Sequence, residues 1–324
     1  MREDVLAQPH QLADALWRVE AAQVPHHDAA GGLVVCGMGG SAVGGDLAAA
    51  AIGRRATRPL RTVRGYVLEP WFDPDTLVLC ASYSGWTEET LACYAAAGEA
   101  GAPRVAVTTG GPLADRARED GVPVIGVPAG MQPRAAVVYM TVAALECAAR
   151  CGAAPALEQE IEGAAAVLAA LAEDDSEARE VAAILHGTLP VVHGAESTTA
   201  LARRWKAQLN ENAKVAAFAS ELPEANHNEI EGWGWGRQNA PLAAVFLSAP
   251  GMHPRIELRI ELTAEKLADD GVLVVHARAR GESAVEHVLS LIMLGDLVSV
   301  ELAELAGVDP MPVAEILALR AALA

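Results

Sequence analysis

The stretch from Gln208 to Trp233 gathers side chains that can exchange protons. It contains Glu211, Lys214 and His227, with further glutamates and asparagines, in a chain that is 52% hydrophobic. A carboxylate can act as a general base, and imidazole gives and takes protons near neutral pH. The stretch is too polar for a core and too apolar for a solvated linker, so we expect it to form one wall of an active site. The plainer alternatives are a solvated helix face for Glu211 and a hydrogen-bonded loop for His227.

A glycine-rich turn follows the first predicted strand. The apolar run Leu33–Cys36 leads into GMGGSAVGGD at residues 37–46 and then into an alanine-rich helix. Backbone N–H groups in such a turn, together with the positive end of the helix dipole, favour a phosphate. No lysine follows the glycines, which excludes a Walker A loop, and the dinucleotide fingerprint fits only loosely. A tight turn that packs the helix on the strand is the structural alternative.

Hydroxyl groups follow a second apolar strand, Leu77–Ala81, in the sequence SYSGWTEET. Ser82, Ser84 and Thr87 lie at the start of a helix predicted over residues 88–99. One hydroxyl would serve as a helix cap, whereas three can hold phosphate oxygens without a cation.

An arginine at residue 134 precedes an apolar helix predicted over residues 135–149. A positive charge at the start of a helix opposes the helix dipole, so it needs another reason to be there. Arg134 is therefore either an anion-binding residue or an exposed surface charge.

Strand and helix patterns alternate along the chain, which predicts an α/β fold with doubly wound parallel sheets and flanking helices. The pattern restarts near Leu189 after an acidic helical segment at 155–182. A length of 324 residues is long for one core, so we expect two domains, residues 1–154 and 155–324. Further strands are predicted near 61–67, 104–108, 122–127, 242–247, 256–261 and 271–277.

Composition restricts the partners. A net charge of −18, without a cluster of basic residues, argues against nucleic acid. No apolar run reaches the ~18–20 residues of a membrane span, and the acidic first segment does not look like a secretory signal, so we expect a cytoplasmic protein. The five cysteines lack zinc-site spacing, and we expect neither a metal nor a cofactor.

Five motifs, GMGGSAVGGD, SYSGWTEET, LNENAKVAAF, ELPEANHNE and AGVDP, together resemble the bifunctional phosphoglucose/phosphomannose isomerase family. Members consist of two sugar-isomerase (SIS) domains of flavodoxin-like fold. The similarity runs in order from about residue 33 to the C-terminus. It implies an aldose–ketose isomerase that interconverts glucose 6-phosphate and mannose 6-phosphate with fructose 6-phosphate through a cis-enediol.

The resemblance also assigns roles to residues. It implies that Arg134 stabilises the enediolate, that Glu211 moves the proton between C1 and C2, and that His227 opens the sugar ring. Members are dimers in which the neighbouring subunit supplies this histidine, so we expect a homodimer with its active site at the subunit interface. We expect supporting roles for Asn210, Asn212 and Glu221. The substrate phosphate is assigned to Gly40, Ser41, Ser82, Ser84 and Thr87.

The sequence differs from the family pattern at three places that are expected to lie around the sugar. The family lysine that assists ring opening is Arg320 here, and arginine cannot exchange a proton near neutrality. We expect Arg320 to hold a sugar oxygen and His227 to transfer the proton alone. Trp86 replaces an asparagine and could narrow the pocket or stack on the sugar. Residues 311–313 lack a threonine associated with admitting both C2 epimers. The alternatives are an isomerase of a different sugar phosphate and a non-catalytic phosphosugar-binding SIS protein.

Overall fold

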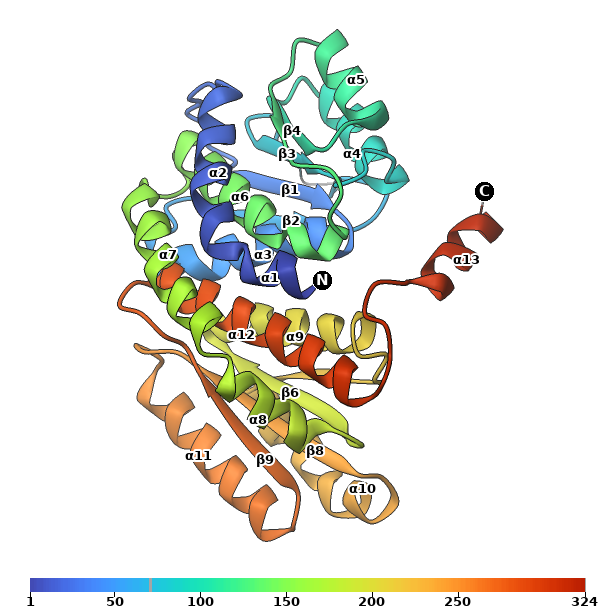
Figure 1. The fold of residues 1–324 in the computed structure, drawn as a ribbon. Coiled ribbons are helices and arrows are strands. Elements are labelled where there is room, and N and C mark those ends of the chain that lie inside the picture. Colours follow the sequence, from blue (N-terminus) through green and yellow to red (C-terminus); the bar gives the residue numbers. More distant parts are fainter. Residues whose placement is uncertain (70–71, 324) are drawn as a thin grey trace. The chain divides into compact units, whose positions relative to one another are not determined.

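The computed structural model of the protein describes residues 1–69 and 72–323 (Figure 1). The chain divides into two compact units. The N-terminal unit comprises Leu6–Ala170 and Arg280–Ser290, and the C-terminal unit comprises Met1–Val5, Leu171–Ala279 and Leu291–Ala324. These are units of contact density, so the expected domain boundary between residues 154 and 155 stays a prediction.

The N-terminal unit is built on a five-stranded parallel sheet with the order β2-β1-β3-β4-β5. Its two central strands, β1 (Leu33–Gly37) and β3 (Leu77–Ala81), are buried along their whole length. Continuous burial is typical of parallel strands covered on both faces, and it explains their unbroken apolar sequences. The remaining strands are β2 (Leu60–Val63), β4 (Arg104–Thr108) and β5 (Val124–Gly126).

Helices cover this sheet. Side chains of α4 (Glu88–Glu99) and α5 (Gly111–Glu119) form a core with Val34, Cys36, Val78 and Cys80 on one face. In α3, a Cβ atom on Gly44 would lie 2.6 Å from the Met140 carbonyl carbon, so glycine allows α3 and α6 to pack closely. The remaining helices are α2 (Gln8–Ala21), α3 (Gly39–Ile52), α6 (Val137–Arg150) and α7 (Glu158–Glu173), with 3-10 turns η1 (Gly53–Arg55) and η2 (Pro133–Ala136).

The C-terminal unit has a four-stranded parallel sheet with the order β7-β6-β8-β9. Two parallel sheets with flanking helices confirm the predicted α/β fold class. The strands are β6 (Leu189–Ala195), β7 (Phe218–Leu222), β8 (Leu242–Ser248) and β9 (Leu273–Arg278). The helices are α8 (Ser176–Leu185), α9 (Thr199–Glu211), α10 (Trp233–Asn239), α11 (Pro254–Asp269) and α13 (Ala314–Leu323), while α1 (Arg2–Leu6) and α12 (Ala284–Leu305) contribute to both units. Three short 3-10 turns are η3 (Glu196–Thr198), η4 (Glu224–His227) and η5 (Glu229–Glu231).

The strand predicted over Ile256–Glu261 is wrong, because these residues belong to α11. Apolar residues alternate there, which suggested a strand. The buried positions Ile260, Ala264 and Leu267 instead follow helical spacing, while Leu258 and Leu262 are exposed. Pro254 in the first turn and His253, whose ring accepts the Arg255 N–H, start the helix. Strand β7, which lies inside the polar stretch, was not predicted.

All five cysteines are free and buried. Burial raises the pKa of the Cys147 thiol above its usual range, which keeps the thiol protonated. These side chains behave as small apolar residues. Within the described residues, no helix is both long and apolar enough to cross a membrane.

Candidate functional site

The glycine-rich turn packs directly against the segment that carries Arg134. A Cβ atom on Gly40 would lie 3.1 Å from the Arg134 Cα atom and 3.1 Å from the Pro133 carbonyl oxygen. Such a contact is tighter than ordinary packing allows, so a side chain at residue 40 would push the two segments apart. Glycine therefore keeps the expected phosphate turn beside Arg134.

Ser41 links the two predicted phosphate-binding turns. Its hydroxyl oxygen accepts a hydrogen bond of 3.1 Å from the Tyr83 backbone N–H. The side chain lies at the start of α3 and is buried. The turns after β1 and β3 are thus held together at the carboxyl edge of the sheet, where parallel α/β proteins bind ligands.

The hydroxyl-rich turn after β3 is organised by its own side chains. The hydroxyls of Ser82 and Thr87 lie 2.8 Å apart, and Ser82 also accepts the Gly85 N–H at 3.0 Å. Ser84 is exposed and accepts the Trp86 N–H at 3.2 Å. Thr87 occupies the N-cap of α4 but makes no side-chain capping bond. Helix capping therefore does not account for these hydroxyls, which shape a turn whose outer edge is open.

Trp86 is exposed at the rim of this turn. Its indole nitrogen would lie 3.1 Å from a Cβ atom on Gly111, so the ring rests over the turn between β4 and α5. The indole is 69% exposed and offers an uncovered aromatic surface beside the expected phosphate site.

Arg134 is buried, with only 3% of the residue exposed, so the alternative of a surface charge is wrong. It lies in η2, immediately before α6. One guanidinium nitrogen, Nη1, donates to the Gln132 side-chain oxygen at 3.3 Å. A buried guanidinium beside the glycine-rich turn can stabilise negative charge on a ligand held there.

Glu211 is the last residue of α9, and long-range contacts fix this helix. Trp205 is buried and donates its indole N–H to the Leu291 carbonyl at 2.8 Å. One guanidinium nitrogen of Arg204, Nη2, lies 2.9 and 3.0 Å from the two carboxylate oxygens of Asp296. Helix α9 is thereby anchored on α12, and the half-buried Glu211 projects from its end.

The turn after Glu211 is held by polar side chains. Asn210 donates to the Val215 carbonyl at 2.8 Å, and the buried Asn212 donates to the Ser299 hydroxyl at 2.9 Å. Lys214 donates to the backbone carbonyls of Glu211 and Pro312. These contacts fix the end of the helix rather than the Glu211 carboxylate itself.

His227 ends η4 and is exposed in the single chain. Its neighbour Asn226 donates to Thr263 at 2.8 Å and accepts from Arg259 at 3.2 Å, both on α11. Asn228, on the other side, donates to Glu224 at 2.8 Å. The loop is therefore fixed on both sides of the histidine while its ring faces outward.

Arg320 lies on α13, a helix with no buried residue among those described. Glu221 forms a surface contact, 3.6 Å from Arg203. The structure therefore brings Gly40, Ser41, Ser82, Thr87 and Arg134 together within the N-terminal unit. Glu211, His227 and Arg320 belong to the C-terminal unit, and their placement in one site with the phosphate turns stays a prediction.

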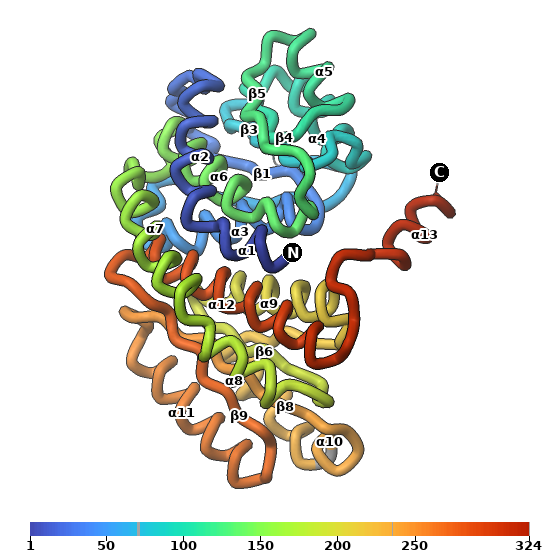
Figure 2. The backbone as a smooth tube through the Cα atoms, in the orientation of Figure 1, coloured from blue at the N-terminus to red at the C-terminus, as the bar shows by residue number. Residues whose placement is uncertain are grey.

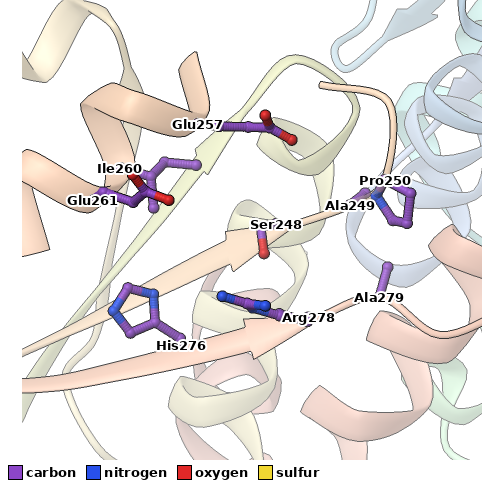
Figure 3. A pocket seen from close by; sticks show the side chains of 9 residues that line it. All are labelled: Ser248, Ala249, Pro250, Glu257, Ile260, Glu261, His276, Arg278 and Ala279. Carbon is purple, nitrogen blue, oxygen red and sulfur yellow. The ribbon is translucent and has the colours of Figure 1, made fainter. Parts of the chain in front are cut away.

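A cavity of about 370 Å³ lies at the carboxyl ends of β8 and β9 (Figure 3). Two carboxylates on α11, Glu257 and Glu261, line one side, and His276 and Arg278 on β9 line the other. Burial, together with the Arg278 charge, lowers the pKa of His276. The residues expected to bind or convert substrate are not among those that line this cavity.

Sequence comparison identifies full-length relatives. The chain is 37% identical over 284 residues to the bifunctional phosphoglucose/phosphomannose isomerase of Aquifex aeolicus, covering 87% of each chain. It is 36% identical over 302 residues to the protein of the same name from Caldicellulosiruptor bescii, covering 90% of this chain and 89% of the relative. The chain belongs to the bifunctional phosphoglucose/phosphomannose isomerase family. In addition, residues 174–323 match the model of the bacterial phospho-glucose isomerase C-terminal SIS domain.

Solved structures agree with this family's fold. A hypothetical protein from Thermus thermophilus aligns with a TM-score of 0.74 at 20% identity, covering 99% of this chain and 90% of the other. Tagatose-6-phosphate ketose/aldose isomerase from Escherichia coli aligns with a TM-score of 0.70 at 16% identity, covering 95% and 93%. At such low identity these similarities support the SIS fold alone.

Two residues beside the expected family site had no role assigned from the sequence. Gln132 contacts the Arg134 guanidinium, and Lys214 joins Glu211 to Pro312. Lys214 had one visible signal, because it is one of only three lysines among 24 basic residues. Gln132 had none, because a glutamine in a loop carries no periodic or charge pattern.

Proposed function

We propose that this protein interconverts glucose 6-phosphate and mannose 6-phosphate with fructose 6-phosphate through a cis-enediol. The observation that carries the proposal is the retention of Glu211 and His227 in a chain of this family, alongside a glycine-rich turn that packs against Arg134 and a hydroxyl-rich turn joined to it through Ser41. Binding a phosphosugar alone would need the turns but no base. A base and a proton-transferring histidine are what an isomerase adds.

The phosphate would be held by the N-terminal unit. Backbone N–H groups at the start of α3 carry a partial positive charge, and Ser41, Ser82, Ser84 and Thr87 add hydroxyl donors. This arrangement suits a protein with a net charge of −18, because it holds an anion locally with neutral groups. Because neutral groups hold the phosphate, the Arg134 guanidinium stays available for the enediolate oxygens at C1 and C2 of the sugar.

The proton transfer is assigned to Glu211. One carboxylate removes the proton from C2 of the open-chain aldose and returns it to C1, so no second base is needed. A positioned base of this kind contributes about 10²–10⁴-fold to the rate. Arg134 keeps its positive charge throughout and would stabilise the negative oxygens of the enediolate.

Ring opening is assigned to His227, with Arg320 holding a sugar oxygen. An exposed imidazole on a well-fixed loop is suited to reach a site outside its own chain. We therefore propose a homodimer in which each subunit supplies His227 to its neighbour. The proposal assigns the proton moved between C1 and C2 and the ring-opening proton to side chains, and it includes turnover without a metal ion or cofactor. The proposed compartment is the cytoplasm, as expected from the sequence.

The decisive experiment follows proton exchange at C2 in D₂O. Wild-type protein with EDTA should exchange the C2 proton of glucose 6-phosphate and of mannose 6-phosphate and form fructose 6-phosphate. Glu211→Gln should lose exchange by about 10²-fold or more, while Glu265→Gln, an exposed carboxylate on α11, should behave as wild type. Absence of exchange with both hexose phosphates would exclude the proposal.

A second candidate is an isomerase of a different sugar phosphate. The exposed Trp86 indole beside the phosphate turn favours it, because an aromatic face there could select another sugar ring. A D-glucosamine-6-phosphate 4-epimerase from Sulfolobus acidocaldarius is also a relative, at 35% identity over 161 residues, or 49% of this chain. Turnover of a pentose or amino-sugar phosphate well above that of both hexose phosphates would favour this candidate.

A further inference from the structure

Lys214 connects two parts of the C-terminal unit that the proposed function uses. Its ammonium donates to the backbone carbonyl of Glu211 and, at 2.6 Å, to the carbonyl of Pro312, which lies 98 residues further along the chain. Glu211 ends α9, and Pro312 lies two residues before α13, the helix that carries Arg320. A single side chain therefore joins the end of one helix to the start of the other.

The backbone at Lys214 has a conformation that glycine would adopt more easily. Its φ of 58° lies in the left-handed region, which costs a residue other than glycine about 1–2 kcal/mol. Glycine, and less often asparagine, is the usual residue in this region. A lysine is found there instead, although only three of the 24 basic residues in this chain are lysines.

Helix α13 is exposed along the part of it that the structure describes. None of its described residues is buried. Figure 2 shows that the chain runs on from the end of α12 and that α13 stands apart from both α9 and α12, which belong to the same unit. The contact from Lys214 to Pro312 lies at the start of this helix. It therefore restricts where α13, and Arg320 with it, can lie relative to Glu211.

We propose that Lys214 is a positioning residue for the isomerase reaction, holding the Glu211 end of α9 at a fixed separation from the start of α13. This inference rests on the proposed function, because it assumes that Glu211 and Arg320 act on one substrate. An ammonium has three donors in a tetrahedral arrangement and can serve two carbonyls at once, whereas the planar guanidinium fork of arginine suits carboxylates. A displacement of about 1 Å in a catalytic group can cost about 10²-fold in rate.

The first test compares Lys214→Met, Lys214→Gly and Lys214→Arg well below their unfolding temperatures. Methionine removes the ammonium, and kcat should fall about tenfold or more. Lys214→Gly relieves the left-handed strain but also removes the ammonium, so its kcat should be as low as that of Lys214→Met. Arginine keeps the charge and should recover part of the activity. Lys206→Met changes the lysine within α9 itself; it is the matched control and should keep wild-type kcat.

The second test separates positioning from simple helix capping. If Lys214 acts through α13, then Arg320→Met should cost much less in the Lys214→Met background than in wild type. If Lys214 only stabilised α9, the effects of Lys214→Met and Arg320→Met on kcat would multiply in the double variant. Multiplying effects, or a Lys214→Met protein with wild-type kcat and KM, would overturn the proposal.

Glu211→Gln and wild type are measured alongside, by the same C2 exchange assay. If wild type exchanges, Glu211→Gln does not, and Lys214→Met equals wild type, only the role of Lys214 is refuted. If wild type itself exchanges no proton, the proposed function fails and this inference fails with it.

Discussion

The two units build their parts of the proposed site in different ways. In the N-terminal unit, the expected phosphate turns are short segments directly after strands. The hydroxyl-rich turn is shaped by its own hydroxyl groups, and the Tyr83 N–H joins it to Ser41 of the glycine-rich turn. In the C-terminal unit, Glu211 and His227 lie at the ends of segments that distant residues hold in place, such as Asp296, Ser299 and Thr263. The candidate anion-binding groups thus follow strand ends within a few residues, whereas the position of the proposed acid–base groups depends on helices and loops that distant residues hold.

The two units also differ in the residue types that their interiors bury. The core against α4 and α5 in the N-terminal unit consists of aliphatic side chains, cysteines and Tyr94. The C-terminal sheet buries His193, whose ring stacks on Phe246 with centroids 4.8 Å apart and whose two nitrogens make no hydrogen bond to the described part of the chain. Burial lowers the pKa of His193 to about 4. The C-terminal unit, which carries the proposed proton chemistry, thus also buries a titratable histidine, and its stability should depend on pH.

The largest effect is expected at the buried ion pair that anchors α9. Arg204→Met removes the positive charge beside Asp296, where the side chains of Arg204 and Asp296 are 3% and 1% exposed. Removing one partner of a buried pair costs about 3–5 kcal/mol, which urea unfolding would measure. The exposed pair of Arg203 with Glu221 is the control, and Arg203→Met should cost no more than about 1 kcal/mol.

A double variant sharpens this prediction. Arg204→Met with Asp296→Leu should be more stable than Arg204→Met alone, because no buried charge is then left behind. Equal losses from Arg204→Met and Arg203→Met would contradict the view that long-range packing positions Glu211.

The next effect concerns the pH dependence of stability. An unfolded histidine binds its proton near pH 6.5, whereas folded His193 does so only near pH 4. The unfolded state therefore holds more protons between these values, and the free energy of unfolding should fall as pH is lowered from 6.5 to 4. The loss is about 1.4 kcal/mol per pH unit, or about 2 kcal/mol at pH 5.

His193→Phe should reduce this slope in urea unfolding at pH 7, 6 and 5. Some slope should remain, because burial also lowers the pKa of His276. His186→Asn changes an exposed histidine in the same unit and should leave the slope as in wild type. An unchanged slope in His193→Phe would show that His193 does not cause it.

An effect of similar size is expected from Ser41→Ala in the proposed phosphate site. The substitution removes the acceptor for the Tyr83 N–H and, in the proposal, one hydroxyl donor to the phosphate. A lost hydrogen bond to a charged ligand costs about 1.5–3 kcal/mol, so KM for fructose 6-phosphate should rise at least tenfold with kcat nearly kept. Ser197→Ala, in the corresponding turn after β6, should not change KM. A fall in kcat without a change in KM would remove Ser41 from the phosphate site.

The smallest effect is expected from Arg320→Lys. Lysine can exchange a proton whereas arginine cannot, so turnover of cyclic glucose 6-phosphate should rise. The rise should be less than tenfold, because the proposal already assigns the transfer to His227. Steady-state kinetics on the cyclic substrate would measure this rise. Unchanged turnover would contradict the view that arginine in place of the family lysine removes a proton-exchanging group.

The sequence alone determined the fold class, the central strands and the candidate phosphate-binding groups. Strands such as Leu33–Gly37 are continuous apolar runs, and the glycine and hydroxyl residues follow them within a few positions, so local pattern is enough. Local pattern failed at Ile256–Glu261, where alternating apolar residues form a helix because proline, a cap and the packing of Ile260, Ala264 and Leu267 outweigh the alternation.

Only the tertiary structure decided that Arg134 is buried against Gly40, that Asn212 bonds Ser299, and that Lys214 bridges Glu211 and Pro312. These partners are far apart in the chain, and no spacing rule relates an asparagine or a lysine to a group about a hundred residues away. The chemistry of a side chain can be read from its type, but its position is set by contacts that exist only once the chain has folded.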